Sequence, residues 1–353
     1  MQLALRKDHQ RKTWILVFLG ILAFLVSVFC LFVGSSHMPL ADGFAALFQK
    51  SSSTNNRIIW AIRIPRILAA IIAGGGLALS GLIMQTVLGN DLASPSTLGV
   101  SNAAVFGANL SIIGFAGGFL STGNNLSAYT AGINLYSTSL IAFLFSVLSV
   151  LLILGLCRIR FFSPSVVVLA GIAIGSVWTA ATTVLQFYAT DVGLSAAVIW
   201  SFGDLGRATY SSDLIMAVVV AVGFLSFLLS SWKYNALLGG DDMAKTLGVH
   251  VELFRFVSLL MASLITAVCV SFLGVIGFVG IIAPHIMKRI LGQDHRYLIP
   301  ATLFAGVLLV VLSDTLSRAI GNGSALPVGA ITSLLGAPFF LFIIFERKKG
   351  AVC

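Results

Sequence analysis

The chain has 353 residues, of which 58% are hydrophobic and only 9% are Asp, Glu, Lys or Arg, whereas soluble domains carry about 25% charged residues. With a mean hydropathy of +1.03, it has too little polar material to cover a soluble globule, which excludes a soluble enzyme and predicts an integral membrane protein. The 21 basic residues outnumber the 12 acidic ones, but they stand singly between apolar blocks, so we interpret the surplus as a topology signal and not as a nucleic-acid-binding surface.

Ten apolar runs approach the length of about 20 residues that a membrane-spanning helix needs. The stretch from Phe256 to Leu291 is too long for one pass and is interrupted by glycines and Pro284, so we expect a hairpin whose second limb is short. The sequence therefore predicts an all-α integral membrane protein with a single transmembrane domain over residues 1–353. The ten predicted spans are Trp14–Gly34, Ile67–Leu88, Leu98–Phe119, Thr138–Leu156, Val166–Phe187, Leu214–Trp232, Phe256–Leu273, Phe278–Leu291, Leu298–Leu316 and Val328–Phe345.

The distribution of basic residues predicts the orientation of these spans. The first apolar run is long enough to cross a membrane and no small-residue cleavage site stands out, so we expect a helix there and not a signal peptide. With the N-terminus inside, 15 of the 21 basic residues fall on the cytoplasmic side, and both termini are cytoplasmic. The largest extramembrane pieces are then Ser35–Arg66 and Thr190–Asp213 outside, and Lys233–Arg255 inside, which contains the loop at about 235–250.

Motifs for several kinds of chemistry are missing from the sequence. It has no Gly-x-x-x-x-Gly-Lys-Ser/Thr loop for ATP and no His-Glu-x-x-His zinc motif, and its four cysteines show no Cys-x-x-Cys spacing. We therefore expect neither an enzyme nor a metal site. Asp314 is the one acidic residue within a predicted span, and Arg318 one turn later is a sufficient ion-pair partner. An ion-coupled carrier usually has more intramembrane carboxylates than this.

Three arginines on the predicted outer side run against the topology bias. Arg63 and Arg66 lie three residues apart at the start of the second span, and therefore on one helix face, while Arg318 ends the ninth span on the same side. They could bind a partner, or they could anchor the chain by extending to the lipid headgroups.

The cytoplasmic loop contains a short predicted helix that ends at Gly248. Asp241 and Asp242 stand in its first turn, where acidic groups suit the helix dipole, and an apolar edge follows. Such a helix could insert into a groove on a partner, or it could lie on the membrane surface. The candidate residues are Gly240, Asp241, Asp242, Met243, Ala244, Lys245, Leu247 and Gly248.

Several short motifs together resemble a known family. They are Arg63-Ile64-Pro65-Arg66, Gly81-Leu82-Ile83-Met84-Gln85, Asn90–Pro95 with Leu98–Ser101, Gly277–Gly280 with Ala283-Pro284-His285, Gly292–Arg296, and Leu326–Gly329 before Gly336–Phe340. The set covers nearly the whole chain and is similar to that of the FecCD or BtuC-like permeases, the membrane subunits of type II ABC importers for iron-siderophore complexes, haem and cobalamin. Ten helices with both termini inside is also the topology of that family.

The resemblance implies roles for residues in this sequence. Arg63, Arg66 and Arg318 match arginines that receive acidic side chains from a substrate-binding protein. Segment Gly240–Gly248 matches the coupling helix that docks into a separate ATPase subunit. Ser163, Pro164 and Ser165 fall at the cytoplasmic gate of the family.

The resemblance also implies partners and a cargo. A second permease subunit, forming a homodimer, two ABC ATPase subunits that bind ATP and Mg, and an extracytoplasmic binding protein would complete the importer in a bacterial or archaeal plasma membrane. This chain would carry no cofactor. Ferric siderophore is the favoured cargo, with haem, cobalamin and oxyanions such as molybdate as alternatives. Gln186 and Tyr188, near the outer end of the fifth span, are candidate cavity residues, and interfacial anchoring explains them equally well. An ion-coupled carrier and a membrane enzyme on lipid-linked substrates are the competing hypotheses.

Overall fold

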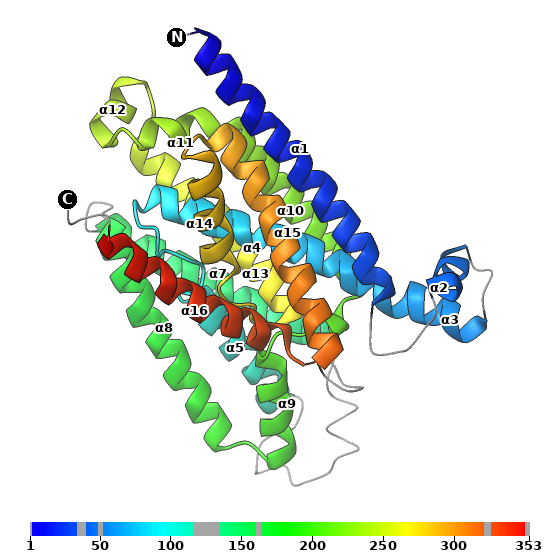
Figure 1. Ribbon diagram of the computed structural model, residues 1–353. Coiled ribbons are helices and arrows are strands. Elements are labelled where there is room, and N and C mark those ends of the chain that lie inside the picture. Colours follow the sequence, from blue (N-terminus) through cyan, green and yellow to red (C-terminus); the bar gives the residue numbers. More distant parts are fainter. Residues whose placement is uncertain are drawn as a thin grey trace. The chain divides into compact units, whose positions relative to one another are not determined.

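The computed structural model describes residues 2–33, 40–48, 52–115, 135–159, 164–320 and 326–349, and every regular element in these ranges is a helix (Figure 1). Within the described residues, each of the ten predicted spans overlaps a helix. Seven helical segments in the described ranges are long and apolar enough to cross a membrane, and three shorter apolar helices accompany them at Val100–Phe115, Asp191–Ser201 and Val328–Phe339. The prediction of an all-α, multi-pass membrane protein is confirmed.

The chain forms two compact units, each built from segments that are distant in the sequence. The first comprises residues 1–82, 205–235 and 277–353, and the second comprises residues 83–204 and 236–276. Helix α4 (Ile64–Val87) begins in the first unit and ends in the second, and α11 (Ser231–Leu237) likewise contributes to both.

The first unit is organised around α15 (His295–Ile320). This helix packs against four others in the unit: α1 (Gln2–Phe32), α10 (Tyr210–Leu229), α14 (Val279–Leu291) and α16 (Val328–Lys349) (Figure 1). Three short elements, α2 (Leu40–Leu47), α3 (Ser53–Arg57) and the π-helical η1 (Ile58–Arg63), precede α4, and the 3-10 turn η4 (Leu205–Arg207) precedes α10.

Glycines allow the helices of the first unit to approach closely. A Cβ on Gly74 of α4 would lie 2.6 Å from the carbonyl oxygen of Gly306 on α15, and a Cβ on Gly81 would overlap the backbone of Gly280 on α14. Because lipid offers no hydrophobic drive between helices, contacts of this kind supply the packing energy. Gly74 and Gly81 therefore serve close packing of α4 against α15 and α14.

The second unit is centred on α5 (Val100–Asn109). This helix packs against α7 (Leu135–Ile159), α8 (Pro164–Phe187), α9 (Asp191–Ser201) and α13 (Val251–Leu273), and the π-helical η2 (Leu110–Phe115) continues it. Small side chains dominate the buried cluster at this contact, which includes Ala104, Ala108, Ile112, Ile113, Ala142, Ala197, Trp200 and Val270. The short α12 (Asp241–Thr246) packs on α13.

The predicted break in the stretch from Phe256 to Leu291 is confirmed. Helix α13 ends at Leu273, Gly274 and Phe278 both adopt positive φ, and α14 has only 13 residues. Two other features differ from the prediction. Helix α9 was not expected, and α10 begins at Tyr210, four residues before the predicted start, so the buried Asp213 lies inside an apolar helix. Asp314 is therefore not the only acidic residue within a span. The end of the predicted span Leu98–Phe119, after Phe115, lies outside the described residues.

Candidate functional site

The three predicted docking arginines lie together in the first unit. Arg63 ends η1, Arg66 lies in the first turn of α4, and Arg318 lies near the end of α15. All three are nearly inaccessible, with exposed fractions of 5%, 9% and 7%. The structure thus gathers residues that are more than 250 positions apart in the chain into one buried cluster, which we call the arginine cluster.

Two members of the arginine cluster bind the C-terminal end of α1. Arg63 donates to the carbonyl oxygens of Leu31 and Phe32, each at 3.0 Å. Arg318 donates to the carbonyl oxygens of Cys30, at 3.1 Å, and Val33, at 2.5 Å. The last carbonyls of a helix have no partner within it and carry its negative partial charge, so guanidinium groups are well suited to this position.

A single carboxylate stands at the centre of the arginine cluster. Asp314, whose side chain is fully buried, lies 3.0 Å from Arg318 Nε and 2.7 Å from Arg66 Nε. The local pair with Arg318 was predicted from the one-turn spacing, whereas the pair with Arg66, 248 residues away, was not. Asp314 and the four backbone carbonyls are thus partners of three guanidinium groups that lie in one place.

The segment Lys233–Arg255 contains the predicted short helix, which is α12. Ala244 is fully buried in a small apolar cluster with Leu237, Val249 and Val251, whereas Met243 and Leu247 are 55% and 53% exposed. Asp241, at the start of the helix, accepts a hydrogen bond of 2.6 Å from Arg255 on α13. The helix is thus held from one side, and it presents two apolar side chains on its surface.

The remaining predicted residues lie on or beside α8. Pro164 and Ser165 form its first turn, while Ser163 lies outside the described residues. Gln186, near the other end of α8, donates a hydrogen bond of 3.0 Å to Asn109 of α5. Tyr188 follows the end of α8, is 55% exposed and packs edge-on against Phe187.

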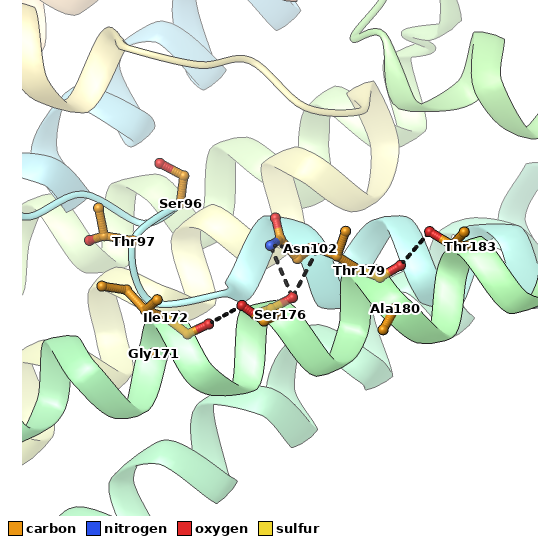
Figure 2. A pocket seen from close by; sticks show the side chains of 10 residues that line it. Ser96, Thr97, Asn102, Gly171, Ile172, Ser176, Thr179, Ala180 and Thr183 are labelled. Atoms are coloured by element: carbon orange, nitrogen blue, oxygen red, sulfur yellow. Dashed lines mark hydrogen bonds between the residues drawn. The ribbon is translucent and has the colours of Figure 1, made fainter.

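A pocket that sequence reasoning had not identified lies between α8, the start of α5 and the loop before α5 (Figure 2). Its volume is about 480 Å³. Hydroxyl and amide groups alternate along it with small residues, and Figure 2 shows them in a row along α8 opposite Asn102. The lining consists of Ser96, Thr97, Asn102, Gly171, Ile172, Gly175, Ser176, Thr179, Ala180 and Thr183.

Comparison with protein families decides the membership of the chain. Residues 21–346 match the model of the FecCD transport family. The chain belongs to the FecCD transport family. This confirms the resemblance found in the sequence motifs, and it places the arginine cluster and α12 within the matched region.

Relatives of this FecCD-family chain align over nearly their full lengths. A protein of Methanocaldococcus jannaschii named as an ABC transporter permease is 43% identical over 94% of both chains. The hemin transport system permease protein HmuU of Yersinia pestis is 34% identical over 94% of this chain and 96% of its own. The vitamin B12 import system permease protein BtuC of Vibrio vulnificus is 29% identical over 97% of both.

A solved structure has the same fold as the FecCD-family chain. It is an inward-facing conformation of a metal-chelate type ABC transporter, with a TM-score of 0.80 and 27% identity, and the match covers 95% of this chain and 99% of the other. The multi-pass helical fold is therefore that of a transporter permease. The relatives named here are permease proteins and not catalytic enzymes.

Two polar features of the FecCD-family chain escaped sequence reasoning. His295 at the start of α15 is buried, and both its backbone N–H and its Nδ1 lie 2.9 Å from Oδ1 of Asn235, whose own amide group donates to Asp294 at 2.8 Å. In the described part of the chain, Asp213 is buried with no hydrogen-bond partner for either carboxylate oxygen. The contact partner of His295 is about 60 residues away, so no local pattern could indicate it.

Proposed function

We propose that this chain is the permease subunit of an ATP-driven importer that carries a metal chelate, with ferric siderophore as the favoured cargo, into a bacterial or archaeal cell. The observation that carries the proposal is the match of residues 21–346 to the FecCD family, together with relatives named as hemin and vitamin B12 permeases. Haem and cobalamin are the alternative cargoes that the same relatives support, and molybdate is a further alternative.

In this proposal the chain works as a homodimer in the plasma membrane, with both termini in the cytoplasm. Two ABC ATPase subunits bind ATP and Mg, and an extracytoplasmic binding protein delivers the chelate. The arginine cluster attracts acidic side chains of that protein through the positive charge of its guanidinium groups. Segment Gly240–Gly248 couples ATPase movement to the spans, and Ser163, Pro164 and Ser165 form the cytoplasmic gate at the start of α8.

The exposed apolar surface of α12 provides the first test of this function. We expect Met243→Asp to reduce ATP-driven chelate uptake in proteoliposomes about tenfold, because a charge placed in an apolar contact with the ATPase costs on the order of 1.4 kcal/mol or more. The folded permease should be unaffected, since Met243 is exposed and surface changes usually alter stability by less than about 0.5 kcal/mol. The measurements are uptake, co-purification of the ATPase and thermal unfolding.

His250→Asp is the matched control, because it adds the same charge to an exposed residue that lies just outside the Gly240–Gly248 segment. It should retain both uptake and ATPase binding. If Met243→Asp and His250→Asp behave alike, the coupling role of the apolar surface is wrong. Uptake that persists without ATP and collapses with the ion gradient would instead establish a secondary carrier.

The arginine cluster provides the second test. We expect Arg63→Glu, Arg66→Glu and Arg318→Glu together to weaken docking of the binding protein about 100-fold, because attraction becomes repulsion. In the unmodified permease, the association rate should fall steeply as salt is added, since charge steers the encounter. Surface plasmon resonance on detergent-solubilised permease measures both.

Arg57→Glu is the control for docking, because Arg57 belongs to the same predicted outer segment but is exposed and outside the arginine cluster. It should leave docking unchanged. The salt dependence needs no variant, so it remains informative even if the triple variant does not fold. Docking that is insensitive to salt would contradict the proposed role of the arginines.

A further inference from the structure

The pocket beside α8 lies at membrane depth. A Cβ on Gly171 would come within 2.6 Å of the carbonyl oxygen of Thr97, and Gly175 lies against Gly99, so the loop before α5 rests on these two positions. They are 7 and 11 residues from the start of α8, which at about 1.5 Å per residue places the loop about 10 to 16 Å along the span. Irregular backbone at such depth is tolerated only against protein or a water-filled cavity. The loop before α5 meets the first condition by packing on α8, so we interpret the adjoining pocket as bordering protein or water and not lipid.

A strip of hydroxyl groups on α8 supports the same conclusion. Ser176, Thr179 and Thr183 are all exposed, and at about 100° per residue they lie within roughly 60° of one another on the helix. The amide group of Asn102 faces this strip from α5, donating to Thr179 Oγ1 and to the carbonyl oxygen of Gly175, both at 3.2 Å (Figure 2). Exposed apolar residues such as Val177 occupy the neighbouring side of α8.

The hydrogen bonds of these groups determine what the pocket can offer a ligand. Ser176, Thr179 and Thr183 each donate their hydroxyl proton to the carbonyl oxygen four residues earlier, at 2.9, 3.0 and 3.1 Å. The amide nitrogen of Asn102 is likewise occupied, as is the hydroxyl proton of Thr97, which is donated to Ser94. Hydroxyl lone pairs remain available, because each hydroxyl oxygen can accept two hydrogen bonds. The lining consequently presents acceptors to a ligand.

The lining also lacks charge. None of the ten described residues around the pocket is acidic or basic. A charged ligand that gives up hydrating water where it contacts the lining needs a compensating charge there, and without one this partial desolvation is not offset. The start of α5 adjoins the pocket, but the partial charge at a helix N-terminus, about half an elementary charge, cannot balance a multiply charged anion.

We propose that this pocket is a binding site on the import path for an electrically neutral metal chelate that carries amide N–H and hydroxyl donors. The volume of about 480 Å³ lies within the range of about 300 to 1,000 Å³ typical of small-molecule sites. The proposal rests on the proposed function, and it narrows the cargo by excluding anionic chelates and free oxyanions from this site.

Thiol labelling in the assembled importer tests the accessibility of the pocket. The native cysteines are replaced, and Ser176→Cys or Val177→Cys is introduced; the two positions are adjacent, but Val177 lies on the apolar side of α8. A membrane-impermeant methanethiosulfonate reagent is expected to label Ser176→Cys at least tenfold faster than Val177→Cys. Equal rates would overturn the assignment of the pocket to a water-filled path.

Chelate protection tests the ligand class. At 1 mM, the neutral hydroxamate chelate ferrichrome is expected to slow labelling of Ser176→Cys at least threefold, whereas the anionic ferric citrate leaves the rate unchanged. Adding Thr183→Lys to the Ser176→Cys variant supplies a positive charge in the pocket. Ferric citrate should then slow the labelling of Ser176→Cys. The proposal would be overturned if ferric citrate protected Ser176→Cys without the added lysine, or if ferrichrome did not protect it. It would also be overturned if ferric citrate failed to protect Ser176→Cys when Thr183→Lys is present.

The pocket hypothesis and the proposed function can fail independently of each other. ATP-driven uptake is measured on the same proteoliposomes, with ferrichrome, ferric citrate and cyanocobalamin as probes. If one of these is imported but ferrichrome fails to protect Ser176→Cys, the function stands and the neutral-chelate site is wrong. If none of the three is imported and ferrichrome still protects, the pocket stands and ATP-driven chelate import is contradicted.

Discussion

Asp314→Asn is expected to lower the free energy of unfolding by about 3 to 5 kcal/mol, which is typical when one partner of a buried ion pair is removed. The carboxylate is fully buried and lies within 3.0 Å of both Arg66 and Arg318. Its loss leaves two buried guanidinium groups without this carboxylate in a low-dielectric environment. Because Arg318 also holds the end of α1, we expect the contact between α1 and α15 to loosen first. Reversible unfolding in mixed detergent micelles measures the change.

Asp242→Asn is the matched control, since it removes the same charge from a fully exposed side chain. Asp242 lies 3.9 Å from Lys245 on the surface of α12, and surface pairs of this kind contribute about 0 to 1 kcal/mol. Asp314→Asn and Asp242→Asn should therefore differ several-fold in their effect on stability. Similar effects would mean that Asp314 adds no more to stability than an exposed carboxylate does.

The extent to which this site could be predicted depends on sequence separation. The pair of Asp314 and Arg318 follows from helix geometry, because residues four apart meet on one face. The pair of Asp314 and Arg66 joins two helices that are 248 residues apart, and no periodicity in either helix indicates the other. The sequence thus indicated which arginines were unusual, but not that they are buried or that they share one carboxylate.

The same distinction applies to α12. Its acidic first turn and terminal glycine predicted a short helix correctly, because these are local signals. The predicted apolar edge grouped Met243 and Leu247 with Ala244, whereas the structure buries only Ala244, against Val249 and Val251. Which apolar residue of a short helix is buried depends on the chain that follows it, and the residues available to a partner emerge only from that packing.

The sequence did not predict the pocket for a different reason. Serine and threonine inside an apolar run are common, since their hydroxyl groups can bond to the preceding turn of the helix. Ser176, Thr179 and Thr183 become distinctive only once Asn102 and the loop before α5 are placed beside them. Gln186 had been selected as a cavity candidate, and its partner Asn109 lies on the helix that also carries Asn102. The polar strip therefore extends further along α8 than the pocket itself.

Gly81→Ala is expected to destabilise the permease by about 3 kcal/mol, at the upper end of the usual cost of overpacking. A Cβ at this position would overlap the carbonyl group and Cα of Gly280 on α14. Backbone atoms cannot rotate away as a flexible side chain can, so α4 and α14 must separate. Their separation forfeits the close backbone contact that holds transmembrane helices together. The same unfolding assay measures this loss, and uptake should fall with it.

Gly155→Ala is the control that separates packing from helix propensity. Gly155 lies on an exposed part of α7, and a Cβ there would meet nothing within 4 Å. Because alanine is favoured over glycine in a helix by about 1 kcal/mol, we expect Gly155→Ala to be neutral or stabilising. Gly81→Ala should therefore lower stability, whereas Gly155→Ala should leave it unchanged or raise it. If Gly81→Ala is also neutral, α4 and α14 can separate without cost, and close glycine packing is not what holds the first unit together.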